Sequence, residues 1–258
     1  MDFLSRYHTR AFFKKTGPLP GLQGPSEWAA PDILVPRLMT NKGNKKKTSG
    51  RKSSARRENR DAVKIVARAK LPTSFGEFRI FGVKGARPQD EAVALVHGNI
   101  RGGKVAPLVR VHSQCLTGDV FHSLRCDCRA QLELALKKLT ASPAGLLLYL
   151  PQEGRGIGLL NKIRAYELQD GGMDTVQANE SLGFAADTRD YGFSAEALKA
   201  LGVRRVRLLS NNPDKVEQLE KAGIKVVERV PCQPRMTKLT RGYLSTKKSK
   251  MGHLLAGL

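Results

Sequence analysis

Residues 145–168 read GLLLYLPQEGRGIGLLNKIRAYEL, and this stretch sets the fold class. The short apolar run at 145–150 is typical of a strand that is buried on both faces. Residues 157–168 then return to a helical pattern. Gly154, Gly156 and Gly158 lie around the junction, where the chain must turn from the strand into the helix. A strand, a tight turn and a helix in this order form the repeating unit of an α/β protein.

The same alternation continues on both sides of this stretch. Alternating or short apolar runs predict strands at 77–81, 92–96, 108–111, 204–209 and 224–228, and helical periodicity predicts helices at 129–139 and 214–222. Pro213 suits the first position of the last helix, and Asn212 suits its cap. We therefore predict one mixed α/β (α+β) domain.

The first 61 residues differ in composition from the rest of the chain. Residues 16–36 contain five prolines, and residues 41–60 (NKGNKKKTSGRKSSARRENR) contain no large apolar side chain. Such a segment cannot bury enough apolar surface to offset the entropy lost on ordering. We expect a basic, disordered N-terminal extension at 1–61 and a folded domain at 62–258.

The formal net charge of +22 favours anionic partners. The extension holds 14 Lys/Arg and 5 Asp/Glu (net +9), so the rest of the chain carries +13 (22 minus 9) over a longer, mixed surface. A substrate with several phosphates and a nucleic acid both suit such a charge. Nucleic-acid binding is expected only as non-specific attraction to the extension, which lacks interleaved aromatic side chains.

The sequence indicates a cytoplasmic protein without membrane contact. No apolar run approaches the roughly 20 residues that span a bilayer, and the N-terminus has no apolar stretch of the signal-peptide type. The first fifteen residues mix basic and apolar side chains, which leaves an amphipathic organelle-targeting peptide open. A solvated basic extension explains the same residues, and Asp2 counts against targeting.

Three of the four cysteines fall within residues 112–128, which read HSQCLTGDVFHSLRCDC. Cys115, Cys126 and Cys128 are predicted to bind zinc, because clustered thiolates in a reducing compartment are strong zinc ligands. Three protein ligands leave one position for water, as in catalytic zinc sites. Two alternatives stay open: His112 or His122 closes a structural four-ligand site, or the cysteines are unliganded core residues.

Several polar segments are candidates for phosphate binding, each with an ordinary structural explanation. The glycines of 153–158 precede a helix N-terminus, which favours an anion, but a tight turn explains them nearly as well. The segment lacks the Lys-Ser/Thr ending of a P-loop. Residues 211–215 present Lys215 after a strand, yet a helix cap accounts for them equally. Asp187 and Arg189 suit a surface salt bridge, and Lys162 and Arg164 suit a solvated helix face.

Taken together, these segments resemble the GTP cyclohydrolase II family of riboflavin biosynthesis. The matching segments are 110–119 (RVHSQCLTGD), 123–128 (SLRCDC), 152–166 (QEGRGIGLLNKIRAY), 182–191 (LGFAADTRDY), 208–215 (LLSNNPDK) and 250–255 (KMGHLL). The resemblance runs from about residue 63 to the C-terminus and does not include the extension. It implies a GTP cyclohydrolase II-like catalytic domain at 62–258 and a homodimer.

The resemblance also implies a role for each matched residue. Cys115, Cys126 and Cys128 would hold one zinc ion per subunit, and Asp187 would be the general base. Arg189 would be a nucleophile toward the α-phosphate or, more simply, an electrostatic clamp, since an arginine stays protonated. Tyr166 would help position the ring-opening step, and Glu153 would meet the guanine edge. The remaining nucleotide contacts would be Arg110, Val111, His112, Ser113, Gln114, Gln131, Gly154, Arg155, Thr175, Ser210 and Lys215.

The implied reaction converts GTP to 2,5-diamino-6-(5-phosphoribosylamino)pyrimidin-4-one, formate and pyrophosphate, with Mg²⁺ on the triphosphate. The chain departs from the family pattern at Gln114, where glutamate is usual, and at Arg129, where glycine is usual. Ser210 replaces a threonine and keeps the hydroxyl. None of these changes removes a metal ligand, so activity is expected. The alternatives are a zinc-containing nucleotide- or nucleic-acid-binding relative, or a relative with incomplete ring opening.

Overall fold

The computed structural model describes residues 63–185, 187, 189–237 and 240–257. Contacts divide the chain into units at Met1–Ser54 and Ala55–Leu258, and every described residue belongs to the second unit. The disordered extension expected at 1–61 lies outside the described residues. None of the described helices combines the length and the apolar composition that crossing a bilayer requires.

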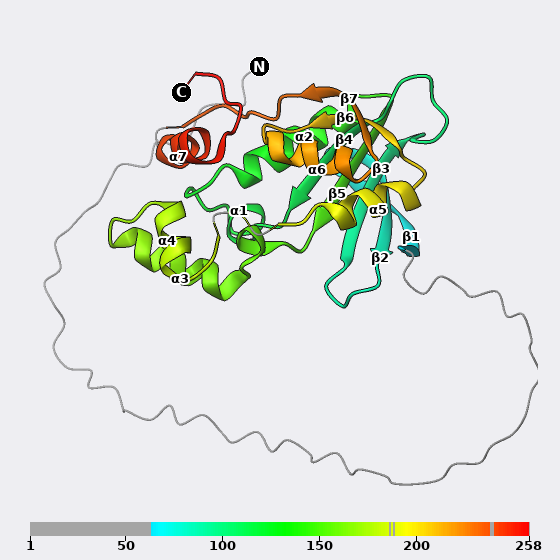
Figure 1. Cartoon of the computed structure of the whole chain (residues 1–258). Coiled ribbons are helices and arrows are strands. Elements are labelled where there is room, and N and C mark those ends of the chain that lie inside the picture. The colour runs from blue at the N-terminus through cyan, green and yellow to red at the C-terminus, as the bar shows by residue number, and fades with distance from the viewer. Residues whose placement is uncertain (1–62, 186, 188, 238–239, 258) are drawn as a thin grey trace, which may run out of the picture. The chain divides into compact units, whose positions relative to one another are not determined.

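The described residues form a seven-stranded mixed sheet with the order β1-β2-β3-β5-β4-β6-β7 (Figure 1). The strands are β1 Lys64–Thr73, β2 Gly76–Lys84, β3 Glu91–Gly98, β4 Leu108–Ser113, β5 Ala144–Leu150, β6 Arg205–Leu209 and β7 Lys225–Val230. β1, β2, β3 and β5 pair antiparallel, whereas β5, β4, β6 and β7 pair parallel. The carboxyl ends of β4, β5 and β6 therefore meet at one edge of the sheet.

Helices cover both faces of the parallel half of the sheet. α5 (Gly192–Ala200) and α6 (Pro213–Lys221) pack on the face that carries Leu146 and Leu148 of β5. α2 (Cys128–Thr140) packs on the opposite face, against Leu147. Burial on both faces explains why 145–150 is apolar without alternation. A Cβ at Gly145 would lie 2.6 Å from the Leu139 carbonyl oxygen, so only glycine permits α2 to lie this close to β5.

The remaining helical elements carry or directly follow residues that line one cavity near the carboxyl ends of the parallel strands. They are α1 Leu116–Asp119, the 3-10 turn η1 Glu153–Gly156, α3 Leu159–Asp170, α4 Thr175–Ser181 and α7 Arg241–Met251. α1 follows β4, η1 and α3 follow β5, and α6 follows β6. α4 contacts both α3 and α7. Loops beyond the carboxyl ends of parallel strands are the usual place for a ligand site in α/β proteins.

The predicted α/β class is confirmed, and each predicted strand and helix is present within a few residues of its expected bounds. The Asn212 side chain accepts a hydrogen bond from the Asp214 backbone N–H, with Pro213 at the first helical position, as predicted. Six elements of the described residues were not predicted: β1, α1, η1, α4, α5 and α7. β1 is exposed along most of its length at the edge of the sheet, so its sequence carries no buried alternation.

Candidate active site

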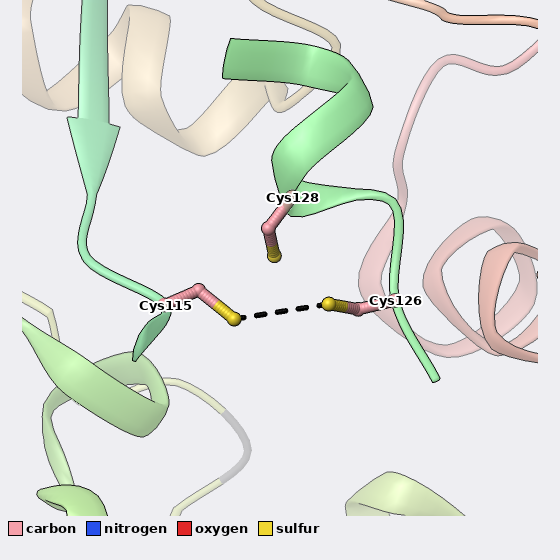
Figure 2. A group of neighbouring side chains, drawn as sticks. All are labelled: Cys115, Cys126 and Cys128. Atoms are coloured by element: carbon pink, nitrogen blue, oxygen red, sulfur yellow. Dashed lines mark hydrogen bonds between the residues drawn. The ribbon is translucent and has the colours of Figure 1, made fainter. Parts of the chain in front are cut away.

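The three predicted cysteines come together from two elements (Figure 2). Cys115 follows β4 at the start of α1, while Cys126 and Cys128 lie at the start of α2. Their Sγ atoms all lie within 4.8 Å of one another, and those of Cys115 and Cys126 are 3.7 Å apart. None of them forms a disulfide. This spacing suits a single metal ion bound by all three sulfurs.

The charge balance of the thiols also favours a metal cation. Hydrogen bonds from Cys126 and Cys128 hold the pKa of Cys115 well below its usual value, and Lys162 adds to the effect. The Cys115 sulfur in turn raises the pKa of Cys126 to about 11. Without a metal ion, the protonation state with one thiolate and two thiols is therefore favoured over the state with three thiolates. A divalent ion supplies the charge that lets all three sulfurs bind as thiolates.

Neither nearby histidine joins the sulfur cluster in the described residues. The His112 Nε2 atom lies 3.2 Å from Asp119 Oδ2, and its buried ring stacks on Tyr149. Asp119 also accepts hydrogen bonds from the Cys115 backbone N–H and the Tyr149 hydroxyl, so it fixes the turn that carries Cys115. His122 is exposed. The cluster thus keeps the three-ligand composition predicted for a catalytic site rather than a closed four-ligand one.

Lys162 was interpreted from the sequence as a residue of a solvated helix face, and this interpretation is wrong. Its side chain is buried, and its Nζ atom lies 3.1 Å from Cys115 Sγ, 2.9 Å from Thr117 Oγ1 and 2.6 Å from Glu153 Oε1. Burial lowers the pKa of Lys162, but the bond to Glu153 and the charge of Cys115 outweigh it and raise the pKa. Lys162 is therefore a cation in contact with the sulfur cluster.

Gly118 lies directly against the sulfur cluster. A Cβ at this position would be 2.9 Å from Cys126 Sγ and 3.1 Å from Cys115 Sγ. The backbone φ of Gly118 lies outside the left-handed region, so an alanine here would be strained only by such contacts. We expect Gly118→Ala to push the sulfurs apart and to weaken zinc binding roughly 10-fold or more, the scale on which supporting residues act at metal sites. Competition with a chromogenic chelator measures the change. Gly103→Ala is the control and should bind zinc as the wild type does. The nearest atom to a Cβ at this position would be the Val105 carbonyl oxygen, at 3.4 Å.

One cavity unites the sulfur cluster with most of the other predicted site residues. Its lining includes Arg110, His112, Ser113, Gln114, Gln131, Glu153, Gly154, Arg155, Tyr166, Thr175, Arg189, Ser210 and Lys215, besides Cys115, Cys126 and Cys128. Val111 and Asp187 are not part of the lining. The Val111 carbonyl accepts a hydrogen bond from Lys215 Nζ, and Asp187 pairs with Arg189.

Buried arginine and lysine side chains line this cavity together. Burial lowers the pKa of Lys215 well below its usual value, with further lowering from Arg110 and Arg189, so an anion bound beside Lys215 would favour its protonation. Burial lowers the pKa of Arg189, but the hydrogen bond to Asp187 outweighs this and keeps the guanidinium charged. Burial raises the pKa of Asp187, and the same bond holds it below its usual value. Such a group of positive charges is suited to a ligand with several negative charges.

A network of polar side chains joins the C-terminal helix α7 to the segment that carries Cys126 and Cys128. Lys247 of α7 donates a 3.0 Å hydrogen bond to Asp127, which lies between these two cysteines. Asp127 accepts a bond from Gln131, and the Gln131 side-chain oxygen accepts a 2.6 Å bond from Arg110. This link could not be predicted from local sequence patterns, because α7 is polar and lacks a clear apolar face.

Two further predicted residues occupy distinctive positions. Arg155 of η1 adopts φ 60° and ψ 35°, a left-handed conformation that costs energy in a non-glycine residue and is common at functional sites. The Tyr166 hydroxyl lies 3.1 Å from Thr117 Oγ1, which in turn contacts Lys162. Tyr166 therefore faces the sulfur cluster, as its expected role in ring opening requires.

The Glu153 carboxylate is already engaged by the protein. It accepts bonds from the Leu116 backbone N–H at 2.7 Å and from Lys162, and it is buried. Glu153 thus ties η1 to the loop after Cys115. Any contact with a guanine edge would use only the lone pairs that these bonds leave.

An α/β protein in which one cavity joins three clustered thiols to buried arginine and lysine side chains has the features of an enzyme active site. The sequence model of the family described as GTP cyclohydrolase II matches residues 64–231, and the chain belongs to this family of hydrolases. It is similar to the GTP cyclohydrolase-2 of Hahella chejuensis (strain KCTC 2396), with 55% identity over 194 residues, 75% of this chain and 93% of that protein.

Other relatives show the same level of similarity. GTP cyclohydrolase-2 of Azotobacter vinelandii (strain DJ / ATCC BAA-1303) is 54% identical over 198 residues, 76% of this chain and 94% of that protein. GTP cyclohydrolase-2 of Histophilus somni (strain 2336) is 52% identical over 193 residues, which cover 75% of this chain and 89% of that protein. A solved two-domain 3,4-dihydroxy-2-butanone 4-phosphate synthase from A. baumannii is 20% identical, with a TM-score of 0.35 over 59% of this chain and 35% of that one, too low to assign a fold.

Proposed function

We propose that this chain converts GTP to 2,5-diamino-6-(5-phosphoribosylamino)pyrimidin-4-one, formate and pyrophosphate, the first step of riboflavin biosynthesis. The observation that carries the proposal is the single cavity that joins the three sulfurs to buried arginine and lysine side chains. One end suits a ring-opening centre and the other suits a triphosphate. Family membership supplies GTP as the substrate.

The sulfur cluster fits one zinc ion per subunit. Cys115, Cys126 and Cys128 would hold it, and Lys162 would offset the negative charge of three thiolates. When bound, zinc supplies a Lewis acid at which water is activated near neutral pH. Tyr166 and Thr117 lie beside the cluster, where they would orient the purine ring and exclude bulk water.

The triphosphate end would be held by the buried cations. Arg189 and Lys215 would neutralise phosphate oxygens, and Arg155 is presented to the same cavity by its left-handed turn. We favour Arg189 as an electrostatic clamp, because its guanidinium stays protonated beside Asp187. Asp187 would hold that clamp in place and, as an ionised carboxylate, accept a proton. Mg²⁺ would bridge phosphate oxygens.

The two departures from the family pattern suit this proposal. Gln114 lines the cavity with a neutral side chain directly before Cys115, so one negative charge fewer lies beside the proposed metal site. Arg129 donates a 2.8 Å bond to the Asp119 carbonyl oxygen and pairs with Glu133, which braces the loop that carries Cys115. We propose a homodimer in the cytoplasm, as the family resemblance implies, with the catalytic domain at 62–258.

Incubation of the purified protein with GTP and Mg²⁺, with and without a zinc chelator, tests this function. We expect release of formate and pyrophosphate in equal amounts, and loss of formate when zinc is removed. Readdition of Zn²⁺ should restore it. Pyrophosphate without formate from zinc-loaded protein would exclude the complete reaction and leave either phosphate chemistry alone or ring opening that stops at a formamide. Neither product from folded, zinc-loaded protein would overturn the proposal.

A further inference from the structure

The segment after α7 has no role in the chemistry proposed above, yet it lines the same cavity. α7 ends at Met251, and its cap residue Gly252 adopts the left-handed φ of 63°. The side chain of the next residue, His253, faces the cavity that holds Arg155, Arg189 and Lys215. A histidine therefore joins the buried cations at the end assigned to phosphate.

The backbone around His253 is held firmly in place. Its N–H donates to the Lys247 carbonyl at 3.1 Å, and the Leu254 N–H donates to the Asn211 carbonyl at 2.9 Å. Asn211 lies in the loop after β6, where its side chain bonds to the Cys232 backbone. Further along, the Gln233 side chain bonds to both backbone groups of Ala256. The position of the His253 ring is thus set by the loop next to Ser210 and Lys215.

The Nε2 atom of His253 is buried and has no hydrogen-bond partner among the described residues. A buried polar atom without a partner costs free energy, so a position that retains one is a candidate for ligand contact. Burial lowers the pKa of His253 to about 3, with further lowering from the positive charges of Lys247, Arg189, Lys215 and Arg155. The ring is therefore neutral and can offer an N–H from one nitrogen.

We propose that His253 is a nucleotide-binding residue whose Nε2–H donates a hydrogen bond to a phosphate oxygen of the substrate. His253 lines the cavity together with Arg155, Arg189 and Lys215, so an anion held by these side chains would lie next to the ring. A phosphate oxygen accepts such a bond, whereas the guanine ring would lie toward the sulfur cluster. The C-terminal segment would then form part of the phosphate site. The inference rests on the proposed function only for the identity of the anion.

Two matched variants, His253→Asn and His253→Gln, test this role. Both are polar amides, but only the glutamine amide nitrogen reaches the place of Nε2. Calorimetry of the zinc-loaded full chain with inorganic tripolyphosphate should show roughly 10- to 100-fold weaker binding for His253→Asn, the scale of a hydrogen bond to a charged group. His253→Gln should stay within about threefold of the wild type. The KM for GTP should follow the same order, with little change in kcat.

Guanosine binding and Leu254→Ala supply the controls. Guanosine carries no phosphate, so its affinity should be the same in all variants. Leu254 is half exposed in the same segment, and its truncation should leave tripolyphosphate binding intact. Unchanged tripolyphosphate affinity in His253→Asn, or equal losses in both histidine variants, would overturn the proposal. If the wild type binds tripolyphosphate through His253 but releases no formate, the proposed function fails and this inference stands.

Discussion

Cys126→Ser is expected to leave the protein without bound zinc and without formate release. The serine hydroxyl is a far weaker zinc ligand than a thiolate, and only two of the three sulfurs remain. Loss of an outer-shell partner already costs roughly 10- to 100-fold in metal affinity, so loss of a ligand should cost more. Atomic absorption on the purified protein measures zinc, and formate release from GTP measures turnover.

Cys232→Ser is the matched control for this experiment. Cys232 is buried, as Cys115 is, but its sulfur bonds to the Gln131 carbonyl at 3.8 Å and lies outside the three-cysteine cluster. A serine is close to this cysteine in size and leaves the three clustered sulfurs in place, so this variant should retain zinc and activity. Full zinc content and wild-type formate release in Cys126→Ser would show that this sulfur is not a ligand. Pyrophosphate release in Cys126→Ser would measure how far the phosphate end works by itself.

The elements that could be predicted well from the sequence are those in which the residue types of a short segment match the burial of that segment in the fold. β5 is buried on both faces and has no charged residue, and the Asn212 side chain caps α6. Cys126 and Cys128 flank a single residue in a polar stretch, so their clustering was visible without a fold. In each case the signal lies within a few neighbouring residues.

The parts that the sequence did not predict depend on contacts between distant segments. Lys162 lies 47 residues from Cys115, and on its own helix it is flanked by exposed residues, which resembles a solvated face. The Lys162 charge is buried only because the turn at η1 brings α3 back toward Cys115. The bond between Lys247 and Asp127 spans 120 residues, and it likewise has no local signature. The KMGHLL segment was recognised as a match, but its place beside the cavity required the fold.

Lys162→Met is expected to weaken zinc binding roughly 10- to 100-fold, because the cation that contacts Cys115 is an outer-shell partner of the metal. The same change leaves the buried Glu153 carboxylate without its counter-ion. Removal of one partner of a buried ion pair costs roughly 3–5 kcal/mol in the free energy of unfolding. Chelator competition and urea unfolding measure the two effects separately.

The double variant Lys162→Met/Glu153→Gln separates two effects of the Lys162 charge. One is its pairing with Glu153, which affects the free energy of unfolding, and the other is its contact with Cys115, which affects zinc affinity. It removes the unpaired carboxylate, so part of the lost unfolding free energy should return. Zinc affinity and formate release should not return, because no cation then faces the Cys115 sulfur. Arg164→Met on the same helix is the control, since Arg164 is exposed and bonds only to Asn161 among the described contacts. Wild-type zinc affinity in Lys162→Met, with stability restored in the double variant, would reduce Lys162 to a structural partner of Glu153.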